Sequence, residues 1–256
     1  MNLYHKTEYT NLIYADAFQY MAKLPNNCID VLITDPPYFL SNGGISNSGG
    51  KIVSVDKGDW DKNQDPEQFY RELIIAAQRL LKKDGTIWIF GSMHNIYLVG
   101  YLLEKYNFKI LNNITWQKTN PAPNLSHRMF THSTETIIWA RKSQSSHQIY
   151  NYELMKNRNN GHQMKDVWQT SNTGKCEKRF GKHPTQKPIS VMKRIIEATT
   201  NEDSIILDPF VGSGTTIIAS ELLQRHSIGI DNNEEYLAIA KKRLCNLTTE
   251  KIGLIK

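Results

Sequence analysis

A short acidic and aromatic motif, Asp35-Pro36-Pro37-Tyr38, follows the apolar run CIDVLIT. The Asp35 carboxylate and the Pro36 carbonyl are two acceptors that can take both N–H bonds of an exocyclic amine, which turns the nitrogen lone pair outward. The two prolines stiffen the turn and fix the direction of that carbonyl. Tyr38 can stack on a planar base, an interaction of about 1–3 kcal/mol. This motif predicts activation of an amino group on a nucleobase.

A glycine-rich motif, DPFVGSGTT at 208–216, follows another apolar run. Gly212 and Gly214 let the backbone approach a ligand where a Cβ would clash. Thr215 and Thr216 open a helix whose N-terminal amides can hold a carboxylate. The turn lacks the third glycine of the dinucleotide fingerprint and the Gly-Lys-Thr of a phosphate loop, so NAD and ATP fit poorly. We predict instead that it binds S-adenosylmethionine, which would supply the methyl group.

Four apolar runs of this sequence end in an aspartate: Asp16, Asp35, Asp208 and Asp231. Open α/β sheets bind ligands at the carboxyl ends of their strands, so this repeated placement indicates one binding edge. Asp231 is expected to accept hydrogen bonds from the ribose hydroxyls, and Asp16 from the amino group of the cofactor's adenine. Taken alone, an aspartate in such a position is more often a helix cap.

The segment HPTQKP at 183–188 precedes an expected helix. Lys187 is expected to pair with the methionine carboxylate of the cofactor, and Thr185 and Gln186 offer hydrogen bonds nearby. Two prolines that frame a helix start would explain the same residues structurally.

Strands that alternate with helices must position these motifs. The pattern predicts a Rossmann-like, doubly wound α/β fold with a mainly parallel seven-stranded sheet. A turn is expected at 83–85. The predicted strands are 11–15, 31–34, 86–90, about 110–116, about 135–141, 204–207 and 227–230, and the predicted helices are 17–24, 66–82, 188–200 and 216–226.

Composition is that of an ordinary globular protein: 256 residues with 39% hydrophobic and 22% charged residues. We expect neither a membrane span nor a signal peptide. Three widely spaced cysteines indicate a reducing cytoplasm, although isolated small hydrophobic residues would look the same. The eight histidines show no ligand spacing, so no metal is expected.

Positive charge is concentrated in residues 141–187, which hold ten Lys and Arg against three Asp and Glu, within a net charge of +6. This segment is expected to contact DNA, or to be a solvated surface lobe. We expect a catalytic half at 1–141, a DNA-recognition lobe at 142–182 and a cofactor-binding half at 183–256. Residues 41–50, SNGGISNSGG, are expected to form a mobile loop, either a lid or DNA-contacting arm or a plain surface loop.

The sequence resembles the β-class amino-methyltransferases, in which the Asp-Pro-Pro-Tyr motif precedes the glycine turn. Within that class it is similar to the DpnA-type adenine methylases of restriction–modification systems. The resemblance rests on YFLSNGGISNSGG (38–50), DKGDWDK (56–62), NNITWQKTNPAPNLS (112–126), THSTETI (131–137), GKHPTQKP (181–188) and DPFVGSGTT (208–216).

The resemblance implies a circularly permuted methyltransferase that acts on N6 of adenine in GATC, on double-stranded and also single-stranded DNA, after flipping the base. A homodimer is a further prediction. Phe39 departs from the wider class, where Asn is common. The implied catalytic residues are Asp35, Pro36, Pro37 and Tyr38, and the implied cofactor pocket comprises Asp16, Ala17, Asp35, His183, Thr185, Gln186, Lys187, Asp208, Pro209, Phe210, Gly212, Ser213, Gly214, Thr215, Thr216 and Asp231.

Three alternatives remain open at this point. Cytosine-N4 methylation uses the same geometry, although Asp rather than Ser at position 35 favours adenine. A non-catalytic, sequence-specific DNA-binding protein of the same fold is a second alternative, against which the intact motifs argue. Methylation of RNA or of a glutamine side chain is a third.

Overall fold

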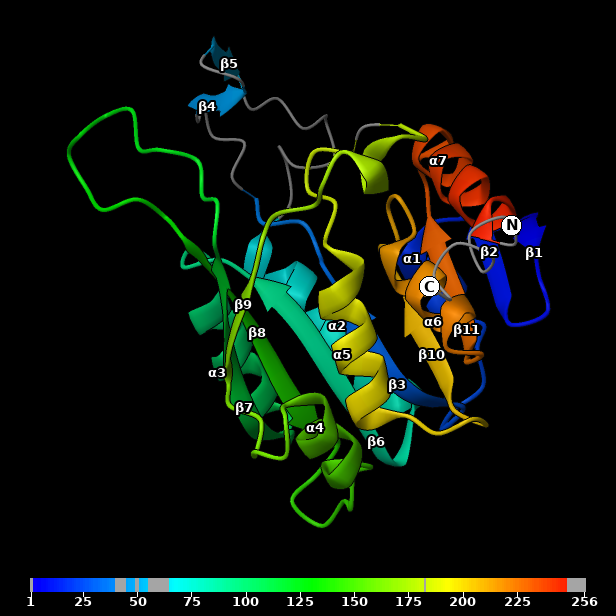
Figure 1. Ribbon diagram of the computed structural model, residues 1–256. Helices are drawn as coiled ribbons and strands as arrows, with labels where there is room; N and C mark the ends of the chain where they lie inside the picture. The colour runs from blue at the N-terminus through cyan, green and yellow to red at the C-terminus, as the bar shows by residue number, and fades with distance from the viewer. Residues whose placement is uncertain (1, 40–44, 49–50, 55–64, 182, 248–256) are drawn as a thin grey trace.

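Alternating apolar side chains along the central strands cover both faces of one sheet. Val31 and Ile33 pack against one layer of helices, and Leu32 between them packs against the other. The structure, a computed structural model, describes residues 2–39, 45–48, 51–54, 65–181 and 183–247 (Figure 1). Burial on both faces is what a parallel sheet between two helical layers requires.

The main sheet of the described residues has nine strands in the order β1-β2-β11-β10-β3-β6-β8-β7-β9. The strands from β2 to β6 in this order are all parallel, whereas β8 is antiparallel to both of its neighbours. The bounds are β1 Asn2–Lys6, β2 Thr10–Tyr14, β3 Ile29–Thr34, β6 Leu81–Gly91, β7 Lys109–Lys118, β8 Thr134–Arg141, β9 Val167–Thr170, β10 Ile205–Asp208 and β11 His226–Asp231.

The predicted mainly parallel α/β sheet is confirmed, and all seven expected strands are present. The number seven is wrong, because β1 and β9 extend the two edges. Both are short, with sequences NLYHK and VWQT, and neither contains a continuous apolar run. An edge strand has one partner and less buried surface, so its sequence carries a weaker signal.

Helices cover both faces of the sheet (Figure 1). One layer contains α1 (Ala17–Met21), α2 (Pro66–Leu80) and α3 (Ile96–Lys105). The other contains α5 (Ile189–Thr199) and α6 (Thr215–Leu222), with α4 (Tyr152–Arg158) against α5 and α7 (Glu234–Cys245) against α6. The sequence prediction lacked α3, α4 and α7. None of the described helices is long and apolar enough to cross a membrane.

Two local predictions need correction. Residues 45–48, expected within a mobile loop, form strand β4 (Ile45–Ser48), which pairs with β5 (Lys51–Ser54) in a separate two-stranded sheet. The rest of the 41–50 segment lies outside the described residues. The turn expected at 83–85 is wrong, because these residues lie inside β6. The pairing of β6 with β3 is irregular there: Leu81 pairs with Ile29 and Thr86 with Val31.

The segment at 142–182 contributes to the central core. Its α4 packs on α5, and its edge strand β9 pairs with β7, in register from Thr115 and Val167 onward. Trp168 of β9 is buried in the cluster that α5 covers. A role of this segment in recognising DNA remains a prediction.

Gly229 of β11 lies where the sheet and α6 pack too closely to admit a larger side chain without strain. A Cβ on Gly229 would lie 2.8 Å from methyl carbons of Ile217 and Val211. Gly229→Ala should therefore lower the free energy of unfolding by about 1–3 kcal/mol. The matched control is Gly100→Ala in α3, whose Cβ would lie 3.6 Å from Ile138. Helix propensity predicts that this control is neutral or about 0.5–1 kcal/mol more stable. Urea denaturation of both variants measures the contrast, and equal shifts would contradict it.

Candidate active site

Four predicted aspartates lie along one edge of the sheet. The strands β2, β11, β10 and β3 are parallel neighbours, so their carboxyl ends meet at this edge (Figure 1). In the same spatial order, Asp231 and Asp208 end their strands, Asp35 directly follows β3, and Asp16 lies two residues after the end of β2. The structure thus brings the Asp-Pro-Pro-Tyr motif and the glycine turn side by side, although 170 residues separate them in the sequence.

Asp35 accepts hydrogen bonds through both carboxylate oxygens. The Tyr38 hydroxyl donates to Oδ1 at 2.6 Å, and the Lys187 ammonium donates to Oδ2. Burial and then the nearby carboxylates of Asp35 and Glu135 raise the pKa of Tyr38 well above its ordinary value. The phenol therefore keeps its proton and remains a donor to Asp35.

A chain of hydrogen bonds braces the turn that follows Asp35. Tyr70 of α2 donates to the Pro37 carbonyl at 2.6 Å, and the Asn95 side chain donates to the Tyr70 hydroxyl at 2.6 Å. Asn95 in turn accepts from the Ser92 amide at 2.8 Å. The end of β6 and the start of α3 thereby hold the Pro37 carbonyl in place.

Lys187 is 5% exposed and carries its charge between two carboxylates. Besides Asp35, its ammonium lies 3.5 Å from Oε2 of Glu135, whose Oε1 pairs with Lys118 at 2.6 Å. Burial alone would lower the pKa of Lys187, but Asp35 and Glu135 raise it above its ordinary value. Burial alone would raise the pKa of Glu135, and the two lysines lower it instead. At neutral pH, Lys187 and Glu135 are therefore both charged.

The glycine turn is held tightly by neighbouring parts of the protein. Gly212 and Gly214 have φ values of +50° and +86°, a region that favours glycine. A Cβ on Gly212 would lie 2.9 Å from the His183 ring, and a Cβ on Gly214 would lie 2.8 Å from Ala240 of α7. Glycine at these two positions thus leaves room for the His183 ring and for α7, in addition to any ligand.

A buried arginine of α7 fixes the same turn. Arg243 donates to the Ser213 carbonyl at 2.7 Å and to the Thr215 hydroxyl at 3.2 Å. Burial lowers the pKa of this guanidinium to about 10, which still leaves it charged at neutral pH. Ten of the predicted cofactor residues are buried: Ala17, Gln186, Lys187, Asp208, Pro209, Gly212, Ser213, Gly214, Thr215 and Thr216.

The other three strand-end aspartates already receive backbone hydrogen bonds. Asp231 accepts from the Gly212 amide at 2.8 Å and from the Asn233 amide, also at 2.8 Å. Asp208 accepts from the Phe210 amide at 3.1 Å, and burial raises its pKa to about 7. Asp16 caps α1 by accepting from the Gln19 amide at 2.9 Å.

The segment from His183 to Lys187 joins the two motifs. The His183 ring packs against Tyr236 with centroids 4.3 Å apart and closes over Gly212. Four residues later, Lys187 reaches Asp35. Between them, Gln186 donates to the Glu177 carbonyl, and its buried Oε1 has no hydrogen-bond partner among the described residues. Lys187 thus lies beside Asp35, whereas the sequence analysis predicted that it pairs with the methionine carboxylate of the cofactor.

Aromatic rings fill the space between the two corners. Phe69 of α2 packs against Phe39 at 5.1 Å and against Phe210 at 5.5 Å between ring centroids. Phe39 has a φ of +53° and also contacts Tyr70 at 5.8 Å. The residue that departs from the wider class therefore belongs to the wall between the catalytic and glycine motifs.

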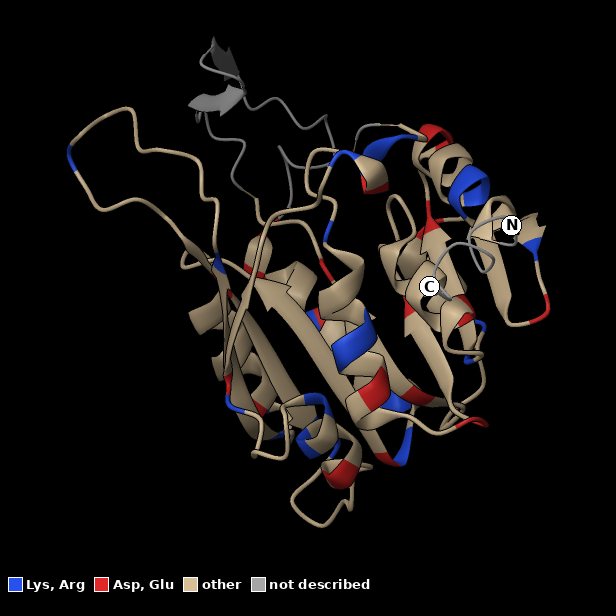
Figure 2. Cartoon of the chain, viewed as in Figure 1, with Lys and Arg blue, Asp and Glu red and all other residues tan. Residues whose placement is uncertain are grey.

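Basic residues of the 141–187 segment divide between the two ends of the sheet (Figure 2). Arg141 pairs in register with Thr86 at the amino end of the parallel strands. Arg158 pairs with Glu197 at the far end of α5, whereas Lys187 precedes the start of that helix. These basic residues are therefore spread from one end of the sheet to the other.

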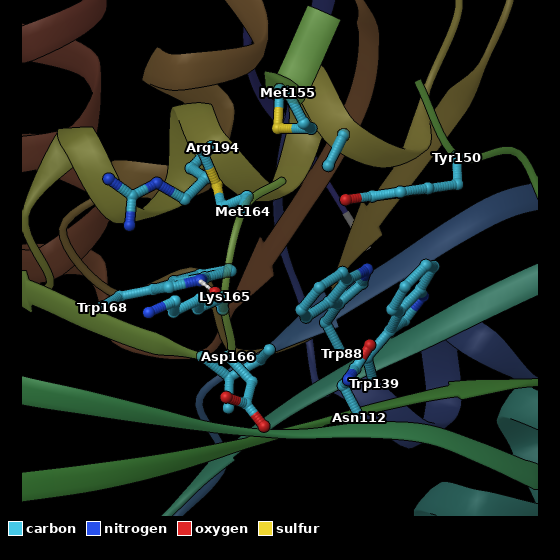
Figure 3. Close-up of a pocket in the computed structure, with 12 residues that line it drawn as sticks. Trp88, Asn112, Trp139, Tyr150, Met155, Met164, Lys165, Asp166, Trp168 and Arg194 are labelled. Carbon is cyan, nitrogen blue, oxygen red and sulfur yellow. Dashed lines mark hydrogen bonds between the residues drawn. The ribbon is translucent and has the colours of Figure 1, made fainter. Parts of the chain in front are cut away.

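A small cavity of about 60 Å³ lies away from this edge, between the sheet and the helices α4 and α5 (Figure 3). The rings of Trp88 and Trp139 stack there at 4.9 Å, and Arg194 lies over the Trp168 ring at 5.0 Å. None of the predicted site residues lines it. The described residues also contain no cluster of three or more His, Cys, Asp or Glu that could hold a metal ion.

Several contributors to the site were missed from the sequence: Lys118, Glu135, Tyr70, Asn95 and Arg243. Glu135 and Lys118 lie on the antiparallel pair β8 and β7, and the sequence analysis assigned this pair no chemistry. The sequence signal was position, since Lys118 lies two residues beyond one predicted strand and Glu135 begins the next. Glu135 pairs with both Lys118 and Lys187, and this arrangement depends on the order of strands in the sheet.

A glycine turn and an acidic edge at the carboxyl ends of a doubly wound sheet, beside an Asp-Pro-Pro-Tyr corner, define an S-adenosylmethionine-dependent methyltransferase. The family described as DNA methylase, the N6/N4 methyltransferases, matches residues 29–242. The chain belongs to this family.

Relatives match along nearly the whole length. The type II methyltransferase M2.LlaDCHI of Lactococcus lactis subsp. cremoris is 60% identical over 245 residues, covering 94% of this chain and 91% of that protein. M2.DpnII of Streptococcus pneumoniae is 60% identical over 237 residues, covering 91% and 88%. The crystal structure of the M1.HpyAVI–SAM complex is 31% identical with a TM-score of 0.67, covering 92% of this chain and 98% of that chain.

The residues present fit S-adenosylmethionine. Gly212 and Gly214 of the turn have no Cβ, and the eight-residue helix α6 begins directly after Gly214. The carboxylates of Asp208 and Asp231 flank the turn and are acceptors for hydroxyl or amino groups. The buried Oε1 of Gln186 is a further acceptor close by.

Asp208 should make stability depend on pH. Its folded pKa of about 7 exceeds the value of about 3.9 for an exposed Asp, so the folded state holds this proton longer. As pH rises from about 4 to 7, the free energy of unfolding should fall by on the order of a few kcal/mol. The Asn side chain of Asp208→Asn cannot ionise. The melting temperature of this variant minus that of the wild type should therefore be larger at pH 8 than at pH 5.

Thermal unfolding of the ligand-free protein at both pH values measures this difference. Asp203→Asn, at an exposed position just before β10, is the control and should follow the wild type. A difference for Asp208→Asn that does not change between pH 5 and pH 8 would contradict the assigned ionisation.

Proposed function

We propose that this DNA methyltransferase transfers a methyl group to N6 of adenine, within GATC, on double-stranded and also on single-stranded DNA. The observation that carries the proposal is the adjacency of the Asp35 corner and the glycine turn, which end the neighbouring strands β3 and β10. Asp at position 35 favours adenine over cytosine, and the resemblance to the DpnA-type methylases implies GATC.

The catalytic corner would activate the amine as follows. Asp35 and the Pro36 carbonyl accept the two N–H bonds of the adenine amino group, and Tyr38 stacks on the base. Each carboxylate oxygen can accept more than one hydrogen bond, so Asp35 can bind the amine while Lys187 stays paired. The charge of Lys187 and the bond from Tyr38 hold the carboxylate in one orientation. S-adenosylmethionine, when bound, supplies a methyl group on a positively charged sulfonium.

The cofactor pocket would lie over the neighbouring strand ends. Asp231 accepts from the ribose hydroxyls, and Asp16 accepts from the adenine amino group. The turn from Asp208 to Thr216 holds the remainder together with His183, Thr185 and Gln186. Because Lys187 is paired with Asp35 and Glu135, we assign it to the catalytic corner as a positioning residue.

The adenine amine is buried in a stacked duplex, so the base must be flipped out or be single-stranded already. Membership of a restriction–modification system follows from the similarity to type II methyltransferases. A cytoplasmic location is consistent with Cys28, Cys176 and Cys245, none of which forms a disulfide with another described residue. A homodimer remains a prediction.

Asp35→Ala should abolish methyl transfer, with a loss of about 100-fold or more in kcat, because one acceptor for the amine is removed. Cofactor affinity, measured by calorimetry, should change little. Asp35→Asn keeps an oxygen acceptor for Lys187 and tests the same role if the alanine variant is unstable. Retained activity in both variants would contradict the assignment.

The matched control is Asp30→Ala on the same strand. Asp30 pairs with Lys82 at 2.8 Å and accepts from the Ile205 amide, but it lies at the opposite end of β3. Its removal should lower stability without changing kcat.

Tritiated-methyl transfer onto oligonucleotides tests the substrate. Paired and single-stranded oligonucleotides with GATC should be labelled, and the same oligonucleotides with the site scrambled should not. Nucleoside analysis should yield N6-methyladenine. N4-methylcytosine would favour the alternative cytosine chemistry, and DNA binding without any label would favour a non-catalytic DNA-binding protein.

A further inference from the structure

The connection between β7 and β8, residues 119–133, projects from the catalytic edge as a long arm (Figure 1). Its apolar side chains are exposed: Phe130 by 97%, Met129 by 61% and Leu125 by 50%. A cluster of large apolar groups in water forgoes the stabilisation that burial would give. Exposure of this kind marks a surface that another molecule covers.

The base of the arm is tied to the catalytic corner. Lys118, at the end of β7, donates its amide to the Ser133 carbonyl at 2.8 Å and pairs through its ammonium with Glu135. Glu135 faces Lys187, which pairs with Asp35. Three successive ion pairs therefore link Lys118, at the base of the arm, to the carboxylate that would bind the target amine.

Hydrogen bonds hold both the base and the tip in shape. At the base, Asn172 donates its amide to the Asn120 side chain at 2.7 Å, which attaches the arm to the segment after β9. Near the tip, the Asn124 side chain accepts from the Ser126 amide at 2.9 Å and donates to the Met129 carbonyl at 2.8 Å. Phe130 is thus exposed on a loop whose conformation is held by these hydrogen bonds.

The charge of the arm suits a polyanion. Residues 119–133, TNPAPNLSHRMFTHS, contain Arg128, His127 and His132 and no acidic residue. Arg128 is exposed and lies within two positions of Phe130. A cation beside an apolar side chain can contact a backbone phosphate while the apolar group meets the bases.

We propose that this arm inserts Phe130, flanked by Met129, into the base stack of duplex DNA at the step from which the target adenine is withdrawn. Arg128 contacts an adjacent phosphate. Apolar wedges of this kind unstack a base step, and filling the gap offsets the cost of extruding the base. The inference rests on the proposed base-flipping methylation and assigns part of that step to the arm.

A duplex in which the target adenine is mispaired distinguishes a role of Phe130 in base extrusion from a general contact with DNA. A mispaired base is already easier to extrude, so a wedge matters less there. Phe130→Ala should lower kcat/KM by about 10-fold or more on the paired GATC duplex, the loss of one to a few kcal/mol of extrusion energy. On the mispaired duplex the loss should be less than about 3-fold. Phe130→Trp keeps a large flat side chain and should retain activity on both duplexes.

Fluorescence of 2-aminopurine in place of the target adenine reports extrusion directly, since the base brightens when it leaves the stack. With saturating wild type the signal should rise, and with saturating Phe130→Ala most of that rise should be lost. Tyr101→Ala, which removes a 59% exposed aromatic side chain from α3, is the matched control and should behave as wild type.

Equal losses on paired and mispaired duplexes would overturn the wedge. So would a change in sedimentation of Phe130→Ala without DNA, because it would indicate that a second copy of this chain covers the arm. Wild-type protein that fails to methylate either duplex would instead contradict the proposed function. Wild-type activity with an unaffected Phe130→Ala would contradict only this inference.

Discussion

A buried ammonium between two carboxylates is the interaction on which the catalytic corner depends. Lys187 has almost no contact with water, so Asp35 and Glu135 must supply the stabilisation that hydration would give. These three residues come from three different regions of the chain: the end of β3, the start of β8 and the segment before α5. Satisfying one buried charge thereby fixes the positions of β3, β8 and the start of α5 around the Asp35 carboxylate.

The sheet sets the distance between the Asp35 corner and the glycine turn. Adjacent strands of a sheet are about 5 Å apart, and β3 and β10 are adjacent and parallel. Asp35 and Asp208 therefore emerge at one edge, close enough for the charge of Asp35 to contribute to the raised pKa of Asp208, after burial. Methyl transfer requires donor and acceptor within a few ångströms, and the proposed assignment places them over neighbouring strand ends.

The contacts that shape the site also contribute to the stability of the fold. Gly212 and Gly214 admit the ring of His183 and the backbone of α7, and Arg243 reaches under the turn to bind its carbonyl. Asp208 is buried, and burial raises its pKa to about 7. At neutral pH, ionising this buried carboxyl lowers the stability of the ligand-free protein. Such local costs are expected where a protein keeps charge ready for a ligand.

Apolar runs bounded by polar turns predicted seven strands of the fold, and the residue types of Asp35 and Gly212 predicted the two motifs, because both signals are local in the chain. Strand order is not local: it determined that Glu135 and Lys118 join the site, that β1 and β9 extend the sheet, and that Lys187 meets Asp35. The sequence alone therefore specified which chemistry the chain carries. Tertiary structure decided which charge stabilises which, because an ion pair depends on separation in space, and residues 35, 135 and 187 become neighbours only when the sheet assembles.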